Sequence, residues 1–234
     1  MLLKDIIYKG KETVSVLYPE GEAREMVFAY LEDVFGIRRH DHILEPDRLL
    51  SDEDVRKAMA DFRRMASGEP LQYITGVAHF YGRKFRVTPD VLIPRQETEL
   101  LCNELILLSD GLYGNRGLET IGRNSEILDM CTGSGCIAWT LALEIPGAAV
   151  TALDISDGAL AVASSQDFEE DISTTGALKP RFIKADVLQG PENSPEIFGS
   201  ADSRTGKFDI IVSNPPYVMD SEQSGCGGCG SQRL

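Results

Sequence analysis

A compact polar and aromatic group, Asn214-Pro215-Pro216-Tyr217, closes the apolar run FDIIVSN near the end of this 234-residue sequence. Proline has no backbone N–H, so two consecutive prolines cannot continue a strand ladder, and the chain stops there with fixed φ angles. The side-chain carbonyl of Asn214 and the proline carbonyls are hydrogen-bond acceptors, and Tyr217 can stack on a flat group. We therefore expect these four residues to hold a planar NH₂ group, which suits chemistry on an amino or amide nitrogen.

A second candidate site is the glycine-containing turn DMCTGSGC (129–136), which lies between an apolar run and a helix-like segment. A dinucleotide-binding fingerprint needs three glycines as G-x-G-x-x-G, but its first position here is Cys131 and its third, counted from Gly133, is Ala138. The pattern fits D-x-(G/C)-x-G-x-G instead, which is typical of loops that hold S-adenosylmethionine. The alternative is a turn with a structural role only. The expected cofactor-binding residues of this loop are Cys131, Thr132, Gly133, Ser134 and Gly135.

Two further carboxylates each follow an apolar run. Asp154 ends AVTALD, nineteen residues past Gly135, where a carboxylate can accept from both hydroxyls of a ribose. The alternative for Asp154 is a cap on the helix that follows it. Asp186 ends FIKAD, where its carboxylate can accept from the exocyclic N–H of an adenine, and the alternative is a solvated turn residue.

These residues need a sheet that brings them together. From residue 126 onward, short branched runs alternate with helix-like segments in the order β-α-β-α-β-β, which predicts a parallel, doubly wound α/β sheet with ligands at the carboxyl ends of its strands. Residues 1–75 predict a small all-α domain. Its signals are an apolar stripe through EAREMVFAYLEDVFGI and a helix that begins after an N-cap at Ser51. Short extended runs around Tyr81-Gly82-Arg83 predict a hairpin linker over 76–95.

Composition narrows the class of protein. The net charge of −14 argues against broad binding to a nucleic-acid backbone, and no apolar run reaches the roughly 18 residues of a membrane span. The five cysteines have no histidine nearby, so we expect no metal site. The pair Cys226-Gly227-Gly228-Cys229 lies in a Gly/Ser-rich stretch, and we interpret 221–234 as a disordered tail. The charged N-terminus is unlike a secretory signal, which makes a cytoplasmic protein the expectation.

Taken in order, these motifs resemble the release factor glutamine methyltransferases (the PrmC/HemK family) over about residues 1 to 220. The block around Pro94, Arg95, Glu97 and Glu99 separates that family from DNA adenine methyltransferases, which share the NPPY group. The segments that carry the resemblance are GEPLQYITG (68–76), FYGRKFRVTPDVLIPRQETELL (80–101), ILDMCTGSGCIAWTLAL (127–143), ALDIS (152–156), ADVL (185–188) and DIIVSNPPYV (209–218).

The resemblance implies a Rossmann-like methyltransferase domain over 96–220, an N-terminal domain that recognises the substrate, and S-adenosylmethionine as cofactor. It implies transfer of a methyl group to N5 of the glutamine in the GGQ motif of class 1 peptide chain release factors. Glutamine contacts would fall on Asn214 to Tyr217. The cofactor contacts would fall on the loop 131–135 and on Asp154, Asp186, Val187 and Asn214.

The sequence departs from the family at two positions. Cys131 replaces the first glycine of the loop, and this small residue is expected to fit if its φ angle is negative. Val187 stands where an aromatic residue is common, so weaker stacking on the adenine is expected.

The sequence also predicts a sheet that is incomplete at its C-terminal end. Such methyltransferases have seven strands, and only four strands are identifiable in this sequence. We therefore expect the run DIIVSN to be an exposed apolar edge, with low solubility and weak or absent activity of the isolated chain. Two alternatives to the glutamine methyltransferase stay open. One is a nucleic-acid amino methyltransferase that uses the same NPPY group on an extruded base. The other is an inactive truncated fragment that retains at most cofactor or partner binding.

Overall fold

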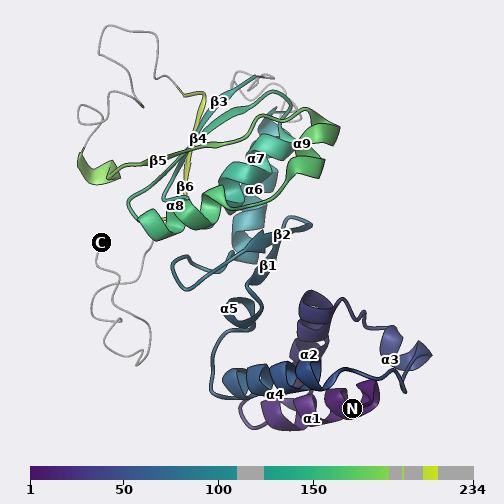
Figure 1. Cartoon of the computed structure of the whole chain (residues 1–234). Coiled ribbons are helices and arrows are strands. Elements are labelled where there is room, and N and C mark those ends of the chain that lie inside the picture. The colour runs from purple at the N-terminus through teal and green to yellow at the C-terminus, as the bar shows by residue number, and fades with distance from the viewer. Residues whose placement is uncertain (110–123, 190–196, 198–207, 216–234) are drawn as a thin grey trace, which may run out of the picture. The chain divides into compact units, whose positions relative to one another are not determined.

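The computed structural model describes residues 1–109, 124–189, 197 and 208–215, and the chain divides into two compact units, Met1–Arg95 and Gln96–Leu234 (Figure 1). The hairpin lies in the first unit. The domain boundaries inferred from the sequence remain predictions. None of the helices in the described part is long and apolar enough to cross a membrane.

The first unit is built from helices around one apolar core. They are α1 (Leu3–Val14), α2 (Glu20–Phe35), the single turn α3 (Asp41–Leu44), α4 (Asp52–Ala66) and the short α5 (Leu71–Thr75). The predicted stripe on α2 is confirmed, since Val27, Tyr30 and Leu31 are buried in this core. The predicted N-cap is confirmed as well, because the Ser51 side chain accepts from the Asp54 N–H at 3.1 Å.

Helix α1 lies within the predicted all-α region and packs against α2 and α4. Its close approach to α4 depends on Gly10, where a Cβ atom would lie 2.6 Å from Phe62 Cε2. Glycine is otherwise unfavourable inside a helix, so at this position the need for space outweighs helix propensity.

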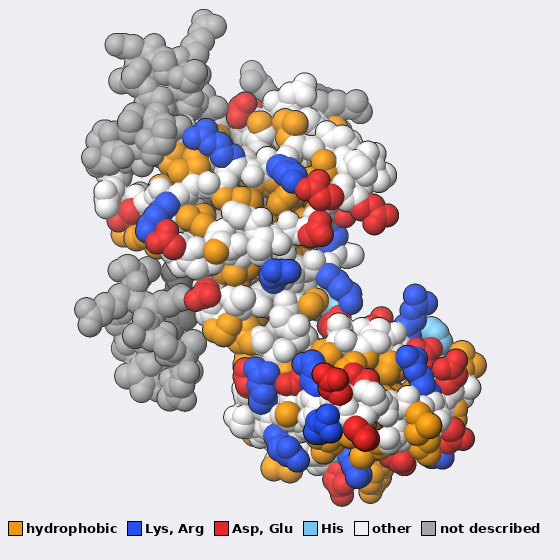
Figure 2. All heavy atoms as spheres, viewed as in Figure 1, with side chains coloured by type: hydrophobic (Ala, Val, Ile, Leu, Met, Phe, Trp, Pro, Cys, Tyr) orange, Lys and Arg blue, Asp and Glu red, His pale blue; other side chains and the backbone are white. Residues whose placement is uncertain are grey.

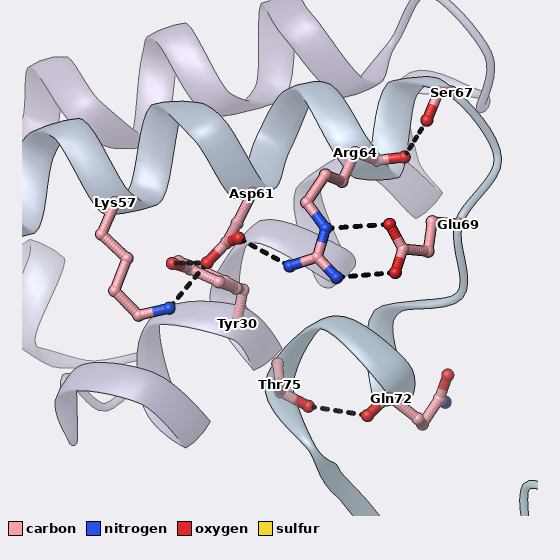
Figure 3. A network of polar contacts seen from close by, with 8 residues as sticks. All are labelled: Tyr30, Lys57, Asp61, Arg64, Ser67, Glu69, Gln72 and Thr75. Atoms are coloured by element: carbon pink, nitrogen blue, oxygen red, sulfur yellow. Dashed lines mark hydrogen bonds and ion pairs between the residues drawn. The ribbon is translucent and has the colours of Figure 1, made fainter. Parts of the chain in front are cut away.

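A buried carboxylate organises the polar contacts of the first unit (Figure 3). Asp61, on α4, is 5% exposed, and its Oδ2 accepts from Tyr30 Oη at 2.7 Å and from Lys57 Nζ at 2.9 Å. Its Oδ1 accepts from Arg64 Nη1 at 3.1 Å, and Arg64 also holds Glu69 beyond the helix end. Burial would raise the pKa of Asp61, but the three hydrogen bonds together hold that pKa below its ordinary value.

The predicted hairpin is confirmed as β1 (Val77–Phe80) paired antiparallel with β2 (Arg83–Arg86). Its two-residue turn places Tyr81 at φ 47° and Gly82 at φ 73°. Positive φ at both central positions is the geometry of a type I′ turn, whose twist matches that of the strands it joins.

The second unit is a parallel sheet with helices, as the alternating pattern predicts (Figure 1). Its order in space is β5-β4-β3-β6, with every neighbouring pair parallel. The helix α9 is an addition that the sequence pattern did not indicate. The elements are α6 (Gln96–Ser109), β3 (Glu126–Met130), α7 (Cys136–Glu144), β4 (Ala149–Asp154), α8 (Asp157–Ser164), α9 (Glu169–Thr175), β5 (Arg181–Lys184), the 3₁₀ turn η1 (Val187–Gln189) and β6 (Ile210–Ser213).

Helix α7 follows the glycine loop directly and is buried from Cys136 through Leu143. It contacts both β4 and α6, so it lies inside the unit and holds the loop before it in place. Within the described residues β6 pairs only with β3, and Ile211 on it is 59% exposed.

Candidate functional site

Strand register brings the predicted site residues to one edge of the sheet. Met130, the last residue of β3, pairs with Leu153 on β4 and with Ser213 on β6. Asp154 pairs with Lys184 on β5. The segments that follow these strands therefore begin side by side at the carboxyl edge. They are the glycine loop, the turn at Asp186 and the group at Asn214.

The glycine loop is fixed by backbone hydrogen bonds to its neighbours. The Thr132 N–H donates to the Leu153 carbonyl at 2.9 Å, and the Gly133 N–H donates to Asp154 Oδ2 at 2.9 Å. Gly133 has φ 55°, and a Cβ atom built on it would meet no heavy atom within 4 Å. The backbone at Gly133 thus faces open space, which leaves room for a ligand to approach it closely.

Cys131 was expected to fit the loop if its φ angle were negative, but this φ angle is +61°. A residue with a Cβ atom is strained in this left-handed region by about 1–2 kcal/mol, whereas glycine adopts it freely. Burial raises the pKa of the Cys131 thiol above its ordinary value, and the charge of Asp154 raises it further. Cys131 is therefore a protonated, half-buried thiol held in a conformation typical of glycine.

We predict that Cys131→Gly stabilises the second unit by about 1 kcal/mol, because it removes this backbone strain. The measurement is the urea midpoint of the fluorescence of Trp139, the single tryptophan of the chain and a residue of this unit. Gly133→Ala is the matched control, since it adds a Cβ at positive φ without a steric contact, and it should lower the midpoint. A lower midpoint for Cys131→Gly would contradict the strain argument.

Asp154 uses both carboxylate oxygens to join the loop to α8. Oδ2 accepts from Gly133, and Oδ1 accepts from the Ser156 N–H at 3.0 Å. A carboxylate has about four acceptor positions, and the bonds to described residues use two of them, which leaves two that could accept from ribose hydroxyls. The alternative role for Asp154 was to cap the next helix. The N-cap of α8 is Ser156 instead, and its side chain accepts from the Ala159 N–H.

Asp186 follows β5 and closes a tight turn. Its Oδ1 accepts from the Leu188 N–H at 2.9 Å, and its Oδ2 accepts from Gln189 Nε2 at 3.2 Å. Val187 opens η1 and is 40% exposed. The carboxylate thus has the turn role that we considered as an alternative, and an adenine contact at Asp186 or Val187 remains a prediction.

Two buried residues that support the loop were not among the predicted site residues. Asp129 is fully buried at the end of β3, where its Oδ2 accepts from Thr132 Oγ1 at 2.6 Å. Burial raises the pKa of Asp129 to about 7. Gln166, after α8, donates from Nε2 to the Ser134 carbonyl at 3.0 Å. The motif around Asp129 could have indicated its role, but no pattern in the sequence points to Gln166.

Asn214 is half-buried directly after β6, and its Nδ2 donates to Thr98 Oγ1 at 3.1 Å. Thr98 belongs to the first turn of α6 and was not among the predicted site residues. Ser213 Oγ donates to the Met130 carbonyl at 2.8 Å and ties β6 to β3 beside it. Pro215 is exposed. Pro216, Tyr217, Cys226, Cys229 and the predicted tail lie outside the described residues.

Charge on the surface is mixed. On the face drawn in Figure 2, Lys and Arg side chains are interspersed with Asp and Glu, with no broad basic area among the residues coloured there. In the described ranges, no three His, Cys, Asp or Glu side chains are grouped to hold a metal ion. The site therefore offers carboxylate, amide and backbone groups around an open glycine loop. That set of groups fits a ligand with a ribose and a polar amino-acid part.

Comparison with known proteins shows which families the two parts of the chain are similar to. A model of the PrmC N-terminal domain matches residues 11–76, and a model of the methyltransferase small domain matches residues 116–226. A structural match at 18% identity is a human methyltransferase 10 domain containing protein, with a TM-score of 0.38 over 59% of this chain and 56% of that chain. This likeness is too distant to bear on function.

Two similar proteins are each called release factor glutamine methyltransferase. The protein from Chlorobaculum tepidum is 40% identical over 194 residues, which are 82% of this chain and 60% of the relative. The protein from Flavobacterium psychrophilum is 33% identical over 223 residues, which are 95% of this chain and 70% of the relative. The chain thus spans 60–70% of the length of these relatives. On these matches, which run through both units, the chain belongs to the family of release factor glutamine methyltransferases.

Proposed function

We propose that this chain takes part in methylating the side-chain amide nitrogen of the GGQ glutamine in class 1 peptide chain release factors, with S-adenosylmethionine as methyl donor. The observation that carries the proposal is the pairing of Met130 with Ser213. This register sets Asn214 next to Cys131, so a group that can hold an amide stands beside the loop that can hold the cofactor.

Different residues would bind the cofactor and the glutamine side chain. The backbone of the loop 131–135 and the free acceptor positions of Asp154 would hold the cofactor, which supplies a sulfonium methyl group when bound. Asn214 Oδ1 and the Pro215 carbonyl would accept from the two N–H bonds of the glutamine amide. These acceptors favour the positive charge that develops on nitrogen as it is attacked, and they orient its lone pair toward the methyl carbon.

Transfer would break the bond between the methyl carbon and the cofactor sulfur as the N–C bond forms, and the methylated nitrogen would then lose one of its protons to water. An amide with positively charged nitrogen is a strong acid, so this chemistry needs no general base with a shifted pKa. Amide nitrogen is a poor nucleophile because its lone pair is delocalised, so orientation and charge stabilisation carry the rate enhancement. We also propose that the helices of the first unit contact the release factor and that the reaction takes place in the cytoplasm, where translation ends.

The proposal is tested by incubating the chain with S-adenosylmethionine labelled in the methyl group and a purified release factor. Label in the tryptic peptide that contains the GGQ motif would support the proposal, and it would contradict the expectation of absent activity drawn from the sequence. Label should be absent when that glutamine is replaced with glutamate in the release factor. Label in the glutamate variant, or no label in the GGQ peptide, would overturn the proposal.

A parallel incubation with adenine-containing DNA and RNA tests the nucleic-acid alternative, for which label in the polymer is the supporting result. Calorimetric titration of the same chain with S-adenosylmethionine tests the fragment alternative. Cofactor binding without transfer to any of the three acceptors would support a fragment that only binds.

A further inference from the structure

The contact between Asn214 and Thr98 joins residues that are 116 positions apart. Thr98 is 6% exposed, so water has little access to its hydroxyl group, and its Oγ1 accepts from Asn214 Nδ2. The backbone before Asn214 is held separately, by pairing of β6 with β3 and by the Ser213 bond to Met130. The side chain of Asn214 is therefore fixed by a different element from the one that fixes its backbone.

An asparagine amide has two ends of similar shape and opposite chemistry. Rotation about its last side-chain bond exchanges the carbonyl oxygen, an acceptor, with the NH₂ group, a donor. A hydroxyl oxygen that accepts from Nδ2 keeps the NH₂ group toward α6, so Oδ1 points away from Thr98. The opposite orientation would present Nδ2 to an incoming amide nitrogen, and two donors would face each other.

We propose that Thr98 is a positioning residue that anchors the Asn214 side chain to α6, so that with Nδ2 on the Thr98 hydroxyl group Oδ1 is presented to the glutamine amide nitrogen. This inference rests on the proposed function. Thr98 does not touch the reacting atoms in this arrangement. Its hydroxyl group restricts rotation of the Asn214 side chain before the substrate arrives, so that the side chain is already in place to contact the substrate amide.

Helix α6, which carries Thr98, is held in place by packing. Cys102, one turn after Thr98, is fully buried, and α6 packs against α7, the helix that begins at the glycine loop. The orientation of Asn214 and the position of the loop thus depend on the same packed pair of helices.

The test uses two variants of the whole chain. Thr98→Val keeps the shape of the side chain and removes the hydroxyl group, whereas Thr98→Ser keeps the hydroxyl group. Solvent exchange of the Asn214 side-chain NH₂ protons is followed by NMR, with their signals identified by loss in Asn214→Ala. Loss of one neutral hydrogen bond predicts exchange about 5-fold faster in Thr98→Val and within about 2-fold of wild type in Thr98→Ser.

The second readout is titration with a Gly-Gly-Gln peptide in the presence of S-adenosylhomocysteine. The dissociation constant of the peptide should rise about 5-fold in Thr98→Val and recover in Thr98→Ser, while that of the cofactor product stays within about 2-fold. A peptide carrying glutamate in place of glutamine has no amide N–H to donate, so its weaker binding should not respond to Thr98→Val.

Different results would contradict the role of Thr98 and the proposed function. Unchanged exchange in Thr98→Val, or equal losses in Thr98→Val and Thr98→Ser, would overturn the role of Thr98 and leave the proposed function standing. A wild-type chain that binds S-adenosylhomocysteine but not the glutamine peptide would overturn the proposed function, and the role of Thr98 with it.

Discussion

Replacing Asp154 with alanine is expected to weaken binding of S-adenosylmethionine by about 10- to 100-fold. The carboxylate holds the Gly133 N–H and the Ser156 N–H and keeps acceptor positions for ribose hydroxyls. A hydrogen bond to a charged group contributes about 1.5–3 kcal/mol, which sets this range. Calorimetric titration of the full chain measures the dissociation constant directly.

The control for this experiment is Asp157→Ala, three residues further along. The Asp157 side chain is 79% exposed and pairs with Lys184, so its removal should change the dissociation constant by less than about 2-fold. Trp139 fluorescence under the titration conditions shows that both variants remain folded. A loss below about 3-fold for Asp154→Ala would mean that this carboxylate only organises the loop and makes no contact with the cofactor.

Replacing Asp61 with alanine is expected to destabilise the first unit by about 2–3 kcal/mol. The change leaves the buried Tyr30 hydroxyl without its acceptor and removes the partner of Lys57 and Arg64, two side chains that are about half exposed. A buried polar group without a partner costs about 1–3 kcal/mol, and the lost charged bonds add to that cost. For a unit of this size the melting temperature should fall by at least about 8 °C.

Two spectroscopic signals separate the units in this experiment. Trp139 belongs to the second unit, so its fluorescence transition should stay within about 1 °C of wild type. Far-UV circular dichroism reports helices of both units and should show the shift. Asp47→Ala is the control, because this 71% exposed carboxylate pairs only at the surface with Lys4 and should cost less than about 1 kcal/mol.

The Asp61 effect should also depend on pH. The pKa of Asp61 is lowered in the folded protein, so its contribution is fully present above the unfolded pKa of about 4 and is lost as pH falls through the folded value. The difference between wild type and Asp61→Ala should therefore be constant near pH 7 and shrink below pH 4. A difference that grew on acidification would contradict the assignment of Asp61 as a paired carboxylate.

Local chemistry made several elements predictable. Ser51 before an acidic first turn indicated a helix start, and Tyr81-Gly82 between short extended runs indicated a hairpin. Alternation of branched runs with helix-like segments indicated a parallel sheet, and that inference placed the loop, Asp154 and Asn214 at one edge. In each case the signal lies within a few residues and reflects a local backbone requirement.

Other features could not be predicted because they depend on partners far away in the sequence. Cys131 has a positive φ angle in a loop whose next two residues donate hydrogen bonds to Leu153 and Asp154. The Asn214 side chain donates to Thr98, 116 positions away. Gly10 is explained only by Phe62, which crosses it on another helix. A pattern read along one segment carries no information about which distant side chain will meet it.

The sheet order also has a consequence for how the protein is made. Among the described strands of this sheet, β6 comes last along the chain, but it pairs with β3, which comes first. During synthesis β3, β4 and β5 can associate while later residues are still being added, because domains fold as the chain emerges. Asn214 reaches Thr98 only after the residues between them have been synthesised. Completion of the site is therefore a late event in folding, governed by a long-range contact that is slow to form.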